Sequence, residues 1–137
     1  VQRRFYKQDV RITQHRPGDG EPYVQADPQQ LREIFYNILV NAFQALPGED
    51  GRIDLSVNRE PDGRLAVRIA DNGPGIAAED LPKVFDPFFT RKSKGTGLGL
   101  AICREMLRLQ HGDIRLENRP GGGAVATVWI PAVEEAS

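Results

Sequence analysis

Cysteine and net charge are both scarce in this sequence of 137 residues, and each scarcity excludes a class of protein. The one cysteine, Cys103, excludes an internal disulfide and an all-cysteine metal site, in agreement with a reducing compartment. It lies in a helical pattern and is expected to be a small packing residue. The 18 basic and 19 acidic residues leave a formal net charge of -1, so no bulk charge attracts nucleic acid or an anionic membrane. We therefore expect no nucleic acid and no direct membrane contact.

Long apolar segments are also missing. No apolar run approaches the roughly 20 residues that a transmembrane helix needs, and the basic start at residues 1–4 is not followed by the apolar core of a signal peptide. As it stands, the chain is expected to be cytoplasmic. Its abrupt start predicts a fragment of a longer polypeptide, and that parent protein remains free to carry a membrane anchor.

Length and apolar patterning predict a single α+β domain over residues 1–137. A chain of about 150 residues buries roughly two-thirds of its unfolded surface, so this length supports a real core but no second domain. Apolar residues at helical spacing predict helices at 29–46 and 97–110. Alternating patterns predict strands at 23–26, 52–58, 64–71, 113–117 and 124–130, and an edge strand at the end of residues 1–16. We expect a two-layer sandwich, with both helices on one face of a mixed, mostly antiparallel sheet.

The segment 71–76, Asp-Asn-Gly-Pro-Gly-Ile, follows a strand whose alternation places Asp71 on the core side. A carboxylate there is costly unless hydrogen-bond donors meet it, and Gly73 and Gly75 let a flat ligand approach the backbone. An amino-bearing heterocycle such as adenine satisfies both conditions. Taken alone, the segment is equally typical of an ordinary Asn-Gly turn after a strand.

Three amide side chains lie beside the apolar face of the first predicted helix. Asn37 and Asn41 are one turn apart, and Gln44 lies next to them. Asparagine is a mediocre helix former, so a pair at this spacing within a helix suggests a functional role. One such role is to supply an amide oxygen to Mg²⁺, a hard cation that takes oxygen ligands. The alternative is a pair of solvated polar residues.

A glycine-rich segment, residues 93–100, leads into the second predicted helix. Glycines before a helix N-terminus leave free backbone N–H groups at the positive end of the helix dipole, which favours anions. Arg91 and Lys92 come directly before this segment and strengthen the site. The pattern predicts that phosphates bind here. Three nearby aromatic residues are instead expected to plug the core: Phe85, Phe88 and Phe89.

Four motifs, taken in order, resemble the four boxes of the catalytic, ATP-binding domain of sensor histidine kinases. They are Asn37-xxx-Asn41, Asp71-x-Gly73-x-Gly75, Phe85-Asp86-Pro87-Phe88-Phe89 and Gly95-Thr96-Gly97-Leu98-Gly99-Leu100. Coincidence is a poor explanation of four motifs in the right order within residues 27–131. The resemblance implies the Bergerat nucleotide-binding fold of the GHKL superfamily. Residues 41–46 and the short lid between Lys92 and Gly95 look most like the nitrogen-regulation subtype.

The resemblance implies ATP and Mg²⁺ as cofactors. Asn41 would ligate the metal, and Asp71 would accept a hydrogen bond from the adenine amino group. The implied catalytic residues are Asn37, Asn41 and Lys92, the last because many members carry a phosphate-contacting lysine where this chain has Gln44. Arg91 or Lys94 would assist Lys92. The implied nucleotide-binding residues are Asn41, Gln44, Asp71, Gly73, Gly75, Ile76, Thr90, Arg91, Lys92, Gly95, Thr96, Gly97, Leu98, Gly99 and Leu100.

Two further positions depart from the family pattern. The small hydroxyl residue that usually follows the last glycine box is Ala124 here, and an aromatic position two residues later is Ala126.

Position 37 separates the branches of this superfamily. Hydrolysing members resemble this helix but carry a glutamate four residues before the metal asparagine, and that carboxylate activates water. Asn37 cannot take a proton, so ATP should be held without rapid hydrolysis. In the family, a histidine on a separate dimerisation hairpin then accepts the γ-phosphate and passes it to an aspartate of a response regulator. Neither His15 nor His111 looks placed to be that acceptor, so the hairpin is expected to lie outside this chain.

Three functions stay open at this point. The preferred one is the catalytic half of a protein histidine kinase, which transfers the ATP γ-phosphate to a histidine of its own dimerisation domain in two-component signal transduction. The others are a GHKL ATPase or anti-sigma-type serine kinase, and a non-catalytic ATP-binding regulatory module. Under the preferred reading we expect the isolated domain to be a monomer and the parent kinase a homodimer.

Overall fold

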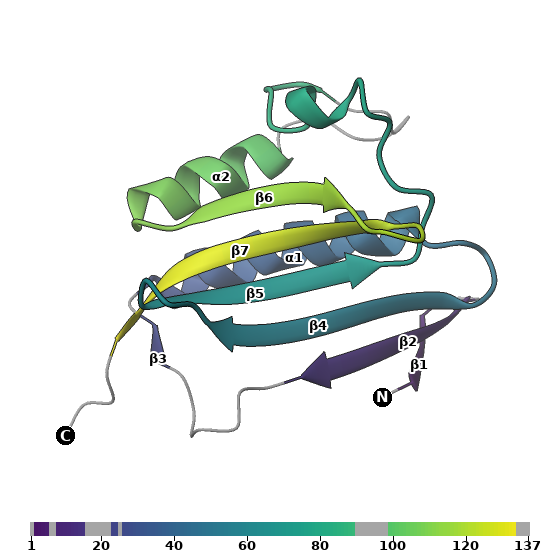
Figure 1. Ribbon diagram of the computed structural model, residues 1–137, viewed down its shortest axis with the longest axis horizontal. Coiled ribbons are helices and arrows are strands. Elements are labelled where there is room, and N and C mark those ends of the chain that lie inside the picture. Colours follow the sequence, from purple (N-terminus) through teal and green to yellow (C-terminus); the bar gives the residue numbers. More distant parts are fainter. Residues whose placement is uncertain (1, 6–7, 16–22, 25, 90–98, 134–137) are drawn as a thin grey trace.

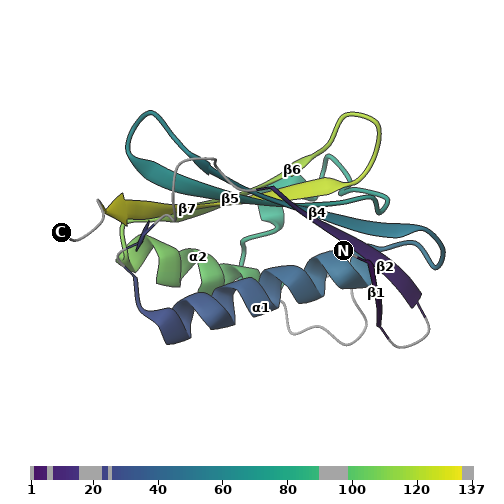
Figure 2. The same ribbon diagram turned by 90° about the horizontal axis from the view of Figure 1, so that it is seen from below.

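Two helices cover one face of a seven-stranded sheet in the computed structural model, which describes residues 2–5, 8–15, 23–24, 26–89 and 99–133 (Figures 1 and 2). In sheet order the strands are β1 (Gln2–Phe5), β2 (Gln8–His15), β4 (Gly51–Arg59), β5 (Arg64–Asp71), β7 (Ala124–Val133) and β3 (Tyr23–Val24), and β6 (Asp113–Asn118) also pairs with β7. The β2–β4 pair is parallel and the other pairs are antiparallel. The predicted α+β sandwich with a mixed, mostly antiparallel sheet is therefore confirmed.

The two helices begin and end close to the predicted bounds. Helix α1 (Pro28–Ala45) is capped by Asp27, whose carboxylate accepts hydrogen bonds from the N–H groups of Gln29 and Gln30, and Pro28 occupies the first turn. Helix α2 (Gly99–Leu109) is the second, and a short 3-10 turn (Leu81–Lys83) precedes it. No described helix is both long and apolar enough to cross a membrane.

The strand predicted at the edge of the sheet lies one position further in. β2 pairs in parallel with β4, from Val10 opposite Gly51 to His15 opposite Ser56, and β1 folds back antiparallel to take the edge. Local alternation cannot show this arrangement, because a parallel neighbour is reached only through a long crossover connection. In this chain that connection contains β3 and α1.

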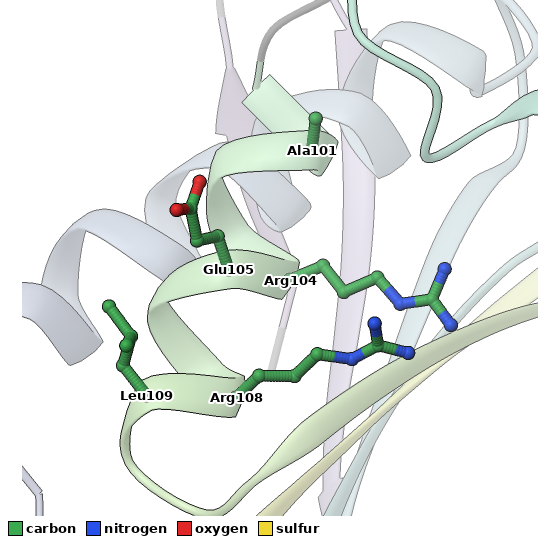
Figure 3. A pocket seen from close by; sticks show the side chains of 5 residues that line it. All are labelled: Ala101, Arg104, Glu105, Arg108 and Leu109. Atoms are coloured by element: carbon green, nitrogen blue, oxygen red, sulfur yellow. The ribbon is translucent and has the colours of Figure 1, made fainter.

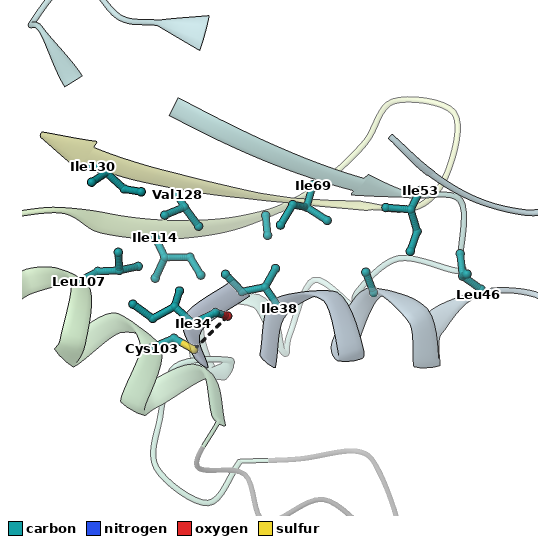
Figure 4. Packing of buried hydrophobic residues seen from close by; sticks show 12 residues of the cluster. Ile34, Ile38, Leu46, Ile53, Ile69, Cys103, Leu107, Ile114, Val128 and Ile130 are labelled. Carbon is teal, nitrogen blue, oxygen red and sulfur yellow. Dashed lines mark hydrogen bonds between the residues drawn. The ribbon is translucent and has the colours of Figure 1, made fainter. Parts of the chain in front are cut away.

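The core lies between the sheet and the buried faces of the two helices (Figure 4). From α1 it takes Ile34 and Ile38, and from α2 it takes Cys103 and Leu107. The Cys103 thiol donates to the Ile34 carbonyl oxygen across 3.7 Å, so it joins the two helices, and the side chain has 0% exposure. Burial raises the pKa of this thiol to about 11, against a hydrogen bond from Asn37. Cys103 is thus a packing residue, as predicted.

The aromatic plug forms only in part. Phe85 packs against the core, but the Phe88 side chain is 72% exposed and its backbone φ is 68°. A turn explains the difference, because the Phe89 N–H donates to the Asp86 carbonyl oxygen across 3.2 Å and Pro87 occupies the first of the two central positions. Phe88 takes the second central position, where a positive φ is the requirement of a type II turn.

Ile34 and Tyr36 on α1 provide a test of this packing. Ile34 has 0% exposure and Tyr36 has 69%. Ile34→Ala should lower the free energy of unfolding by about 2–5 kcal/mol, since it leaves a cavity at the contact with α2. Tyr36→Ala is the control and should change it by no more than about 0.5 kcal/mol. Urea unfolding followed by circular dichroism measures both, and equal midpoints for Ile34→Ala and the wild type would contradict the assigned core.

Candidate ATP-binding site

A cavity of about 510 Å³ opens between the C-terminal half of α1, the loop that follows β5 and the first residues of α2. Eight of the residues predicted from sequence line it: Asn37, Asn41, Gln44, Asp71, Gly75, Ile76, Gly99 and Leu100. These residues come from three separate stretches of the sequence. The fold therefore brings the two asparagines, the aspartate and the helix N-terminus to one site.

Asp71 is buried at the end of β5, with 6% exposure. Its Oδ1 accepts hydrogen bonds from the Gly73 N–H at 2.9 Å and the Ala124 N–H at 3.3 Å. Within the described part of the chain, Oδ2 accepts no hydrogen bond. The predicted core-side carboxylate is thus half satisfied by the backbone, and its second oxygen is left for a donor in the cavity.

The two glycines of the loop have different roles. A Cβ on Gly73 would collide with the Ala45 carbonyl oxygen, so Gly73 allows the loop to pack on the end of α1, and it is not among the residues that line the cavity. Gly75 does line the cavity, and its φ of +81° is one that other residues rarely adopt. The sequence predicted that both glycines allow a ligand to approach the backbone. At Gly73 the group that comes close is the protein's own backbone, at the end of α1.

Two asparagines fix the ends of this loop. Asn72 accepts from the Arg52 N–H and donates to the Asp50 carbonyl oxygen, each at 2.7 Å. Asn118, at the end of β6, accepts from the Ile76 N–H and donates to the Ile76 carbonyl oxygen, again each at 2.7 Å. Asn118 was not among the predicted site residues. Its only signal in the sequence was a place before a Pro-Gly turn, which does not reveal a partner 42 residues away.

The C-terminal half of α1 forms one side of the cavity. Asn37 and Asn41 both line it, and the Asn37 amide nitrogen donates to the Glu33 carbonyl oxygen at 3.1 Å. Its amide oxygen lies beside α2, because a Cβ built on Gly99 would be 3.6 Å from it. The described residues contain no group of three or more His, Cys, Asp or Glu that could hold a metal. Mg²⁺ can complete its coordination with phosphate and water oxygens, so the magnesium predicted at Asn41 does not require such a group.

The predicted phosphate-binding segment is described only at its last two residues. Gly99 and Leu100 begin α2 and line the cavity, so the positive end of this helix dipole faces the site. The other predicted phosphate-binding residues lie outside the described part of the chain: Thr90, Arg91, Lys92, Gly95, Thr96, Gly97 and Leu98.

A second, shallower cavity of about 310 Å³ lies on the outer side of α2 and contains none of the predicted site residues (Figure 3). Arg104 and Arg108 line it, with their Nε atoms 3.6 and 3.4 Å from Asp113 Oδ1. The Arg104 guanidinium also stacks 4.7 Å from the Phe85 ring centre. Partial burial alone would raise the pKa of Asp113, but the Ile114 N–H and Arg108 hold it below the ordinary value. This cluster connects α2 to β6.

Comparison with known proteins gives one consistent result. Residues 26–134 match the family described as histidine kinase-, DNA gyrase B-, and HSP90-like ATPase. The sensor histidine kinase ZraS of Klebsiella oxytoca is 41% identical over 108 residues, which are 79% of this chain and 23% of that protein. This chain thus spans about a quarter of the length of that relative.

Solved structures agree with the sequence comparison. The nucleotide-free catalytic domain of histidine kinase ThkA superposes with a TM-score of 0.77 and 35% identity, over 89% of this chain and 78% of that one. Full-length ShkA in complex with AMPPNP gives 0.78 and 27% identity, over 93% of this chain and 27% of that one. The chain therefore belongs to the histidine kinase-, DNA gyrase B- and HSP90-like ATPase family, and within it is the ATP-binding catalytic domain of a sensor histidine kinase.

Proposed function

We propose that this domain binds Mg²⁺-ATP and transfers the γ-phosphate to a histidine on a separate dimerisation domain of the same kinase. One observation carries the proposal: Asp71, Asn41 and the first turn of α2 all line a single cavity. ShkA was solved in complex with AMPPNP, which supports a nucleotide triphosphate as the ligand.

Each end of the cavity suits one part of the nucleotide. Asp71 Oδ2 accepts a hydrogen bond from the adenine amino group, while Gly75 and Ile76 form the wall beside the base. Asn41 supplies its amide oxygen to Mg²⁺, and bound Mg²⁺ neutralises charge on the phosphates. The α2 N-terminus, with Lys92 and the glycine-rich segment before it, holds the phosphate oxygens.

The amide at position 37 favours transfer over hydrolysis. Its nitrogen already donates to the Glu33 carbonyl oxygen, and an amide has no proton-accepting capacity near neutral pH. A water molecule next to Asn37 is therefore not activated as it would be by a glutamate. The γ-phosphate is therefore not transferred to water and reacts with a stronger nucleophile, which we identify as the histidine of the dimerisation domain.

The partners follow from this chemistry. The first is the histidine-bearing domain of the same kinase, and the second is a response regulator whose aspartate takes the phosphate from that histidine. We place the reaction in the cytoplasm, where ATP is available. The isolated domain is a monomer in this scheme, and the dimer contacts belong to the rest of the kinase.

Base selectivity tests the role of Asp71. ATP and ADP should bind well and GTP poorly, because guanine offers no amino group at the corresponding edge and leaves the buried oxygen unpaired. The penalty is about 1–3 kcal/mol. Asp71→Asn should remove most of this preference, whereas Glu79→Gln, at an exposed carboxylate in the same loop region, should keep it. Equal calorimetric affinities of the wild type for ATP and GTP would refute the role given to Asp71.

Metal dependence tests Asn41. Asn41→Ala should weaken ATP binding in the presence of Mg²⁺ by roughly tenfold or more and abolish phosphotransfer, since an amide ligand is lost. Adenosine, which carries no phosphate and needs no metal, is the matched ligand and should bind as it does to the wild type. Calorimetry with and without Mg²⁺ separates these effects. The assignment fails if the variant keeps full Mg²⁺-ATP affinity.

Phosphotransfer itself needs two components. The isolated domain with radiolabelled ATP should remain nearly inert, and addition of the separately made dimerisation hairpin should label a histidine of that hairpin. Transfer should be slow, because association is now bimolecular. The product should be acid-labile and alkali-stable, as a phosphoramidate is, and Lys92→Ala should slow its formation.

Two results would redirect the assignment. Stable phosphate on serine or threonine would indicate the serine-kinase branch of the superfamily. Rapid release of inorganic phosphate by the domain alone would indicate an ATPase.

A further inference from the structure

One hairpin turn reaches both ends of the base-binding loop. β6 and β7 form an antiparallel pair that closes with Asn118 opposite Ala124 (Figure 1). At the start of the loop, the Ala124 N–H donates to the Asp71 carboxylate at 3.3 Å, and Arg119 Nη1 donates to the Asp71 carbonyl oxygen at 3.1 Å. At the other end, Asn118 holds Ile76 by two hydrogen bonds of 2.7 Å.

The Asn118 amide lies directly behind the cavity wall. It bonds both backbone polar groups of Ile76, and a Cβ on Gly75 would lie only 2.8 Å from its Oδ1. Gly75 and Ile76 line the cavity, whereas Asn118 does not. The side chain therefore contacts the residues that would face the base without facing the base itself.

Asn118 is an exposed residue, so its hydrogen bonds compete with water and contribute little to global stability. Their effect is local. The loop contains two glycines and one proline within six residues, and glycine loses more conformational freedom on ordering than any other residue. A loop held at Ile76 before the ligand arrives spares that ordering cost on binding.

We propose that Asn118 is a positioning residue for the nucleotide base: its amide fixes Gly75 and Ile76 as the cavity wall and so sets the affinity for adenosine. This inference rests on the proposed function, because it takes the Asp71 end of the cavity as the base end. It assigns no contact between Asn118 and the nucleotide. The Asn118 amide is not expected to influence the phosphate end of the proposed site, which contains Gln44 and the α2 N-terminus.

The chemistry of the amide makes the proposal specific. Ile76 presents one donor and one acceptor, and an asparagine side chain offers the matching acceptor and donor. Asn118→Asp keeps the size and the acceptor but turns an oxygen toward the Ile76 carbonyl oxygen. Asn118→Leu keeps the approximate size and loses both hydrogen bonds. The two variants should therefore form a graded series.

The test compares adenosine with inorganic tripolyphosphate as separate probes of the two ends of the site. Adenosine affinity should fall about three- to tenfold in Asn118→Asp and roughly tenfold or more in Asn118→Leu. The net loss of one hydrogen bond corresponds to a loss of up to about tenfold in affinity. Tripolyphosphate affinity and the melting temperature should stay close to wild type in both. Amide hydrogen exchange at Ile76 should become faster in Asn118→Leu, in which the acceptor is lost.

Two controls separate positioning from stability. Asn58→Leu changes an exposed asparagine near the opposite end of the β4–β5 hairpin and should alter neither affinity. Ile114→Val removes a buried methyl group from β6, lowers the melting temperature and should leave adenosine affinity intact.

The outcomes are distinguishable. If the wild type binds adenosine but both Asn118 variants bind it equally well, the positioning role is wrong and the proposed function stands. If adenosine affinity, tripolyphosphate affinity and melting temperature all fall together, Asn118 is only a structural residue. If the wild type itself binds tripolyphosphate but no adenosine, the base end has been misplaced and the proposed function fails with it.

Discussion

The burial of one carboxylate governs the design of this site. Asp71 ends β5 on the core side, where an unpaired charge would be costly, and two backbone N–H groups meet one of its oxygens. Those donors come from Gly73, in the loop, and from Ala124, on β7. The carboxylate therefore joins the loop to the sheet, and under the proposed function its remaining oxygen selects a ligand that donates a hydrogen bond.

Helix α1 contributes to both the core and the cavity, through two adjacent stripes of side chains on its surface. Its apolar stripe carries Ile34 and Ile38 against the sheet and α2, which fixes the rotation of the helix about its axis. That rotation decides where the flanking amides point, because Asn37 and Asn41 each come one residue before a buried position of the stripe, Ile38 and Ala42. The packing that stabilises the fold thus also aims the amides into the cavity.

Features with a local cause could be predicted from the sequence. Alternation placed Asp71 inside, and Asp27 with Pro28 marked the start of α1. Features with a distant cause could not. The inner place of β2 depends on a parallel partner about 40 residues away, and the role of Asn118 depends on the backbone of Ile76. Phe88 was misplaced because a turn closed by Asp86 and Phe89 overrides the usual burial of an aromatic side chain.

Alanine is compatible with the site at the two positions that depart from the family pattern, because the polar contact made there comes from the backbone and not from a side chain. At position 124 the group that bonds Asp71 is the backbone N–H, so the bond survives whatever side chain the residue carries. Ala124 and Ala126 are both buried and both line the cavity. A larger side chain at either position would take volume from the space beside the base. The alanines therefore leave the backbone hydrogen bond to Asp71 intact and affect the shape of the cavity, so under the proposed function this part of β7 influences the fit of the base and not its contact with the carboxylate.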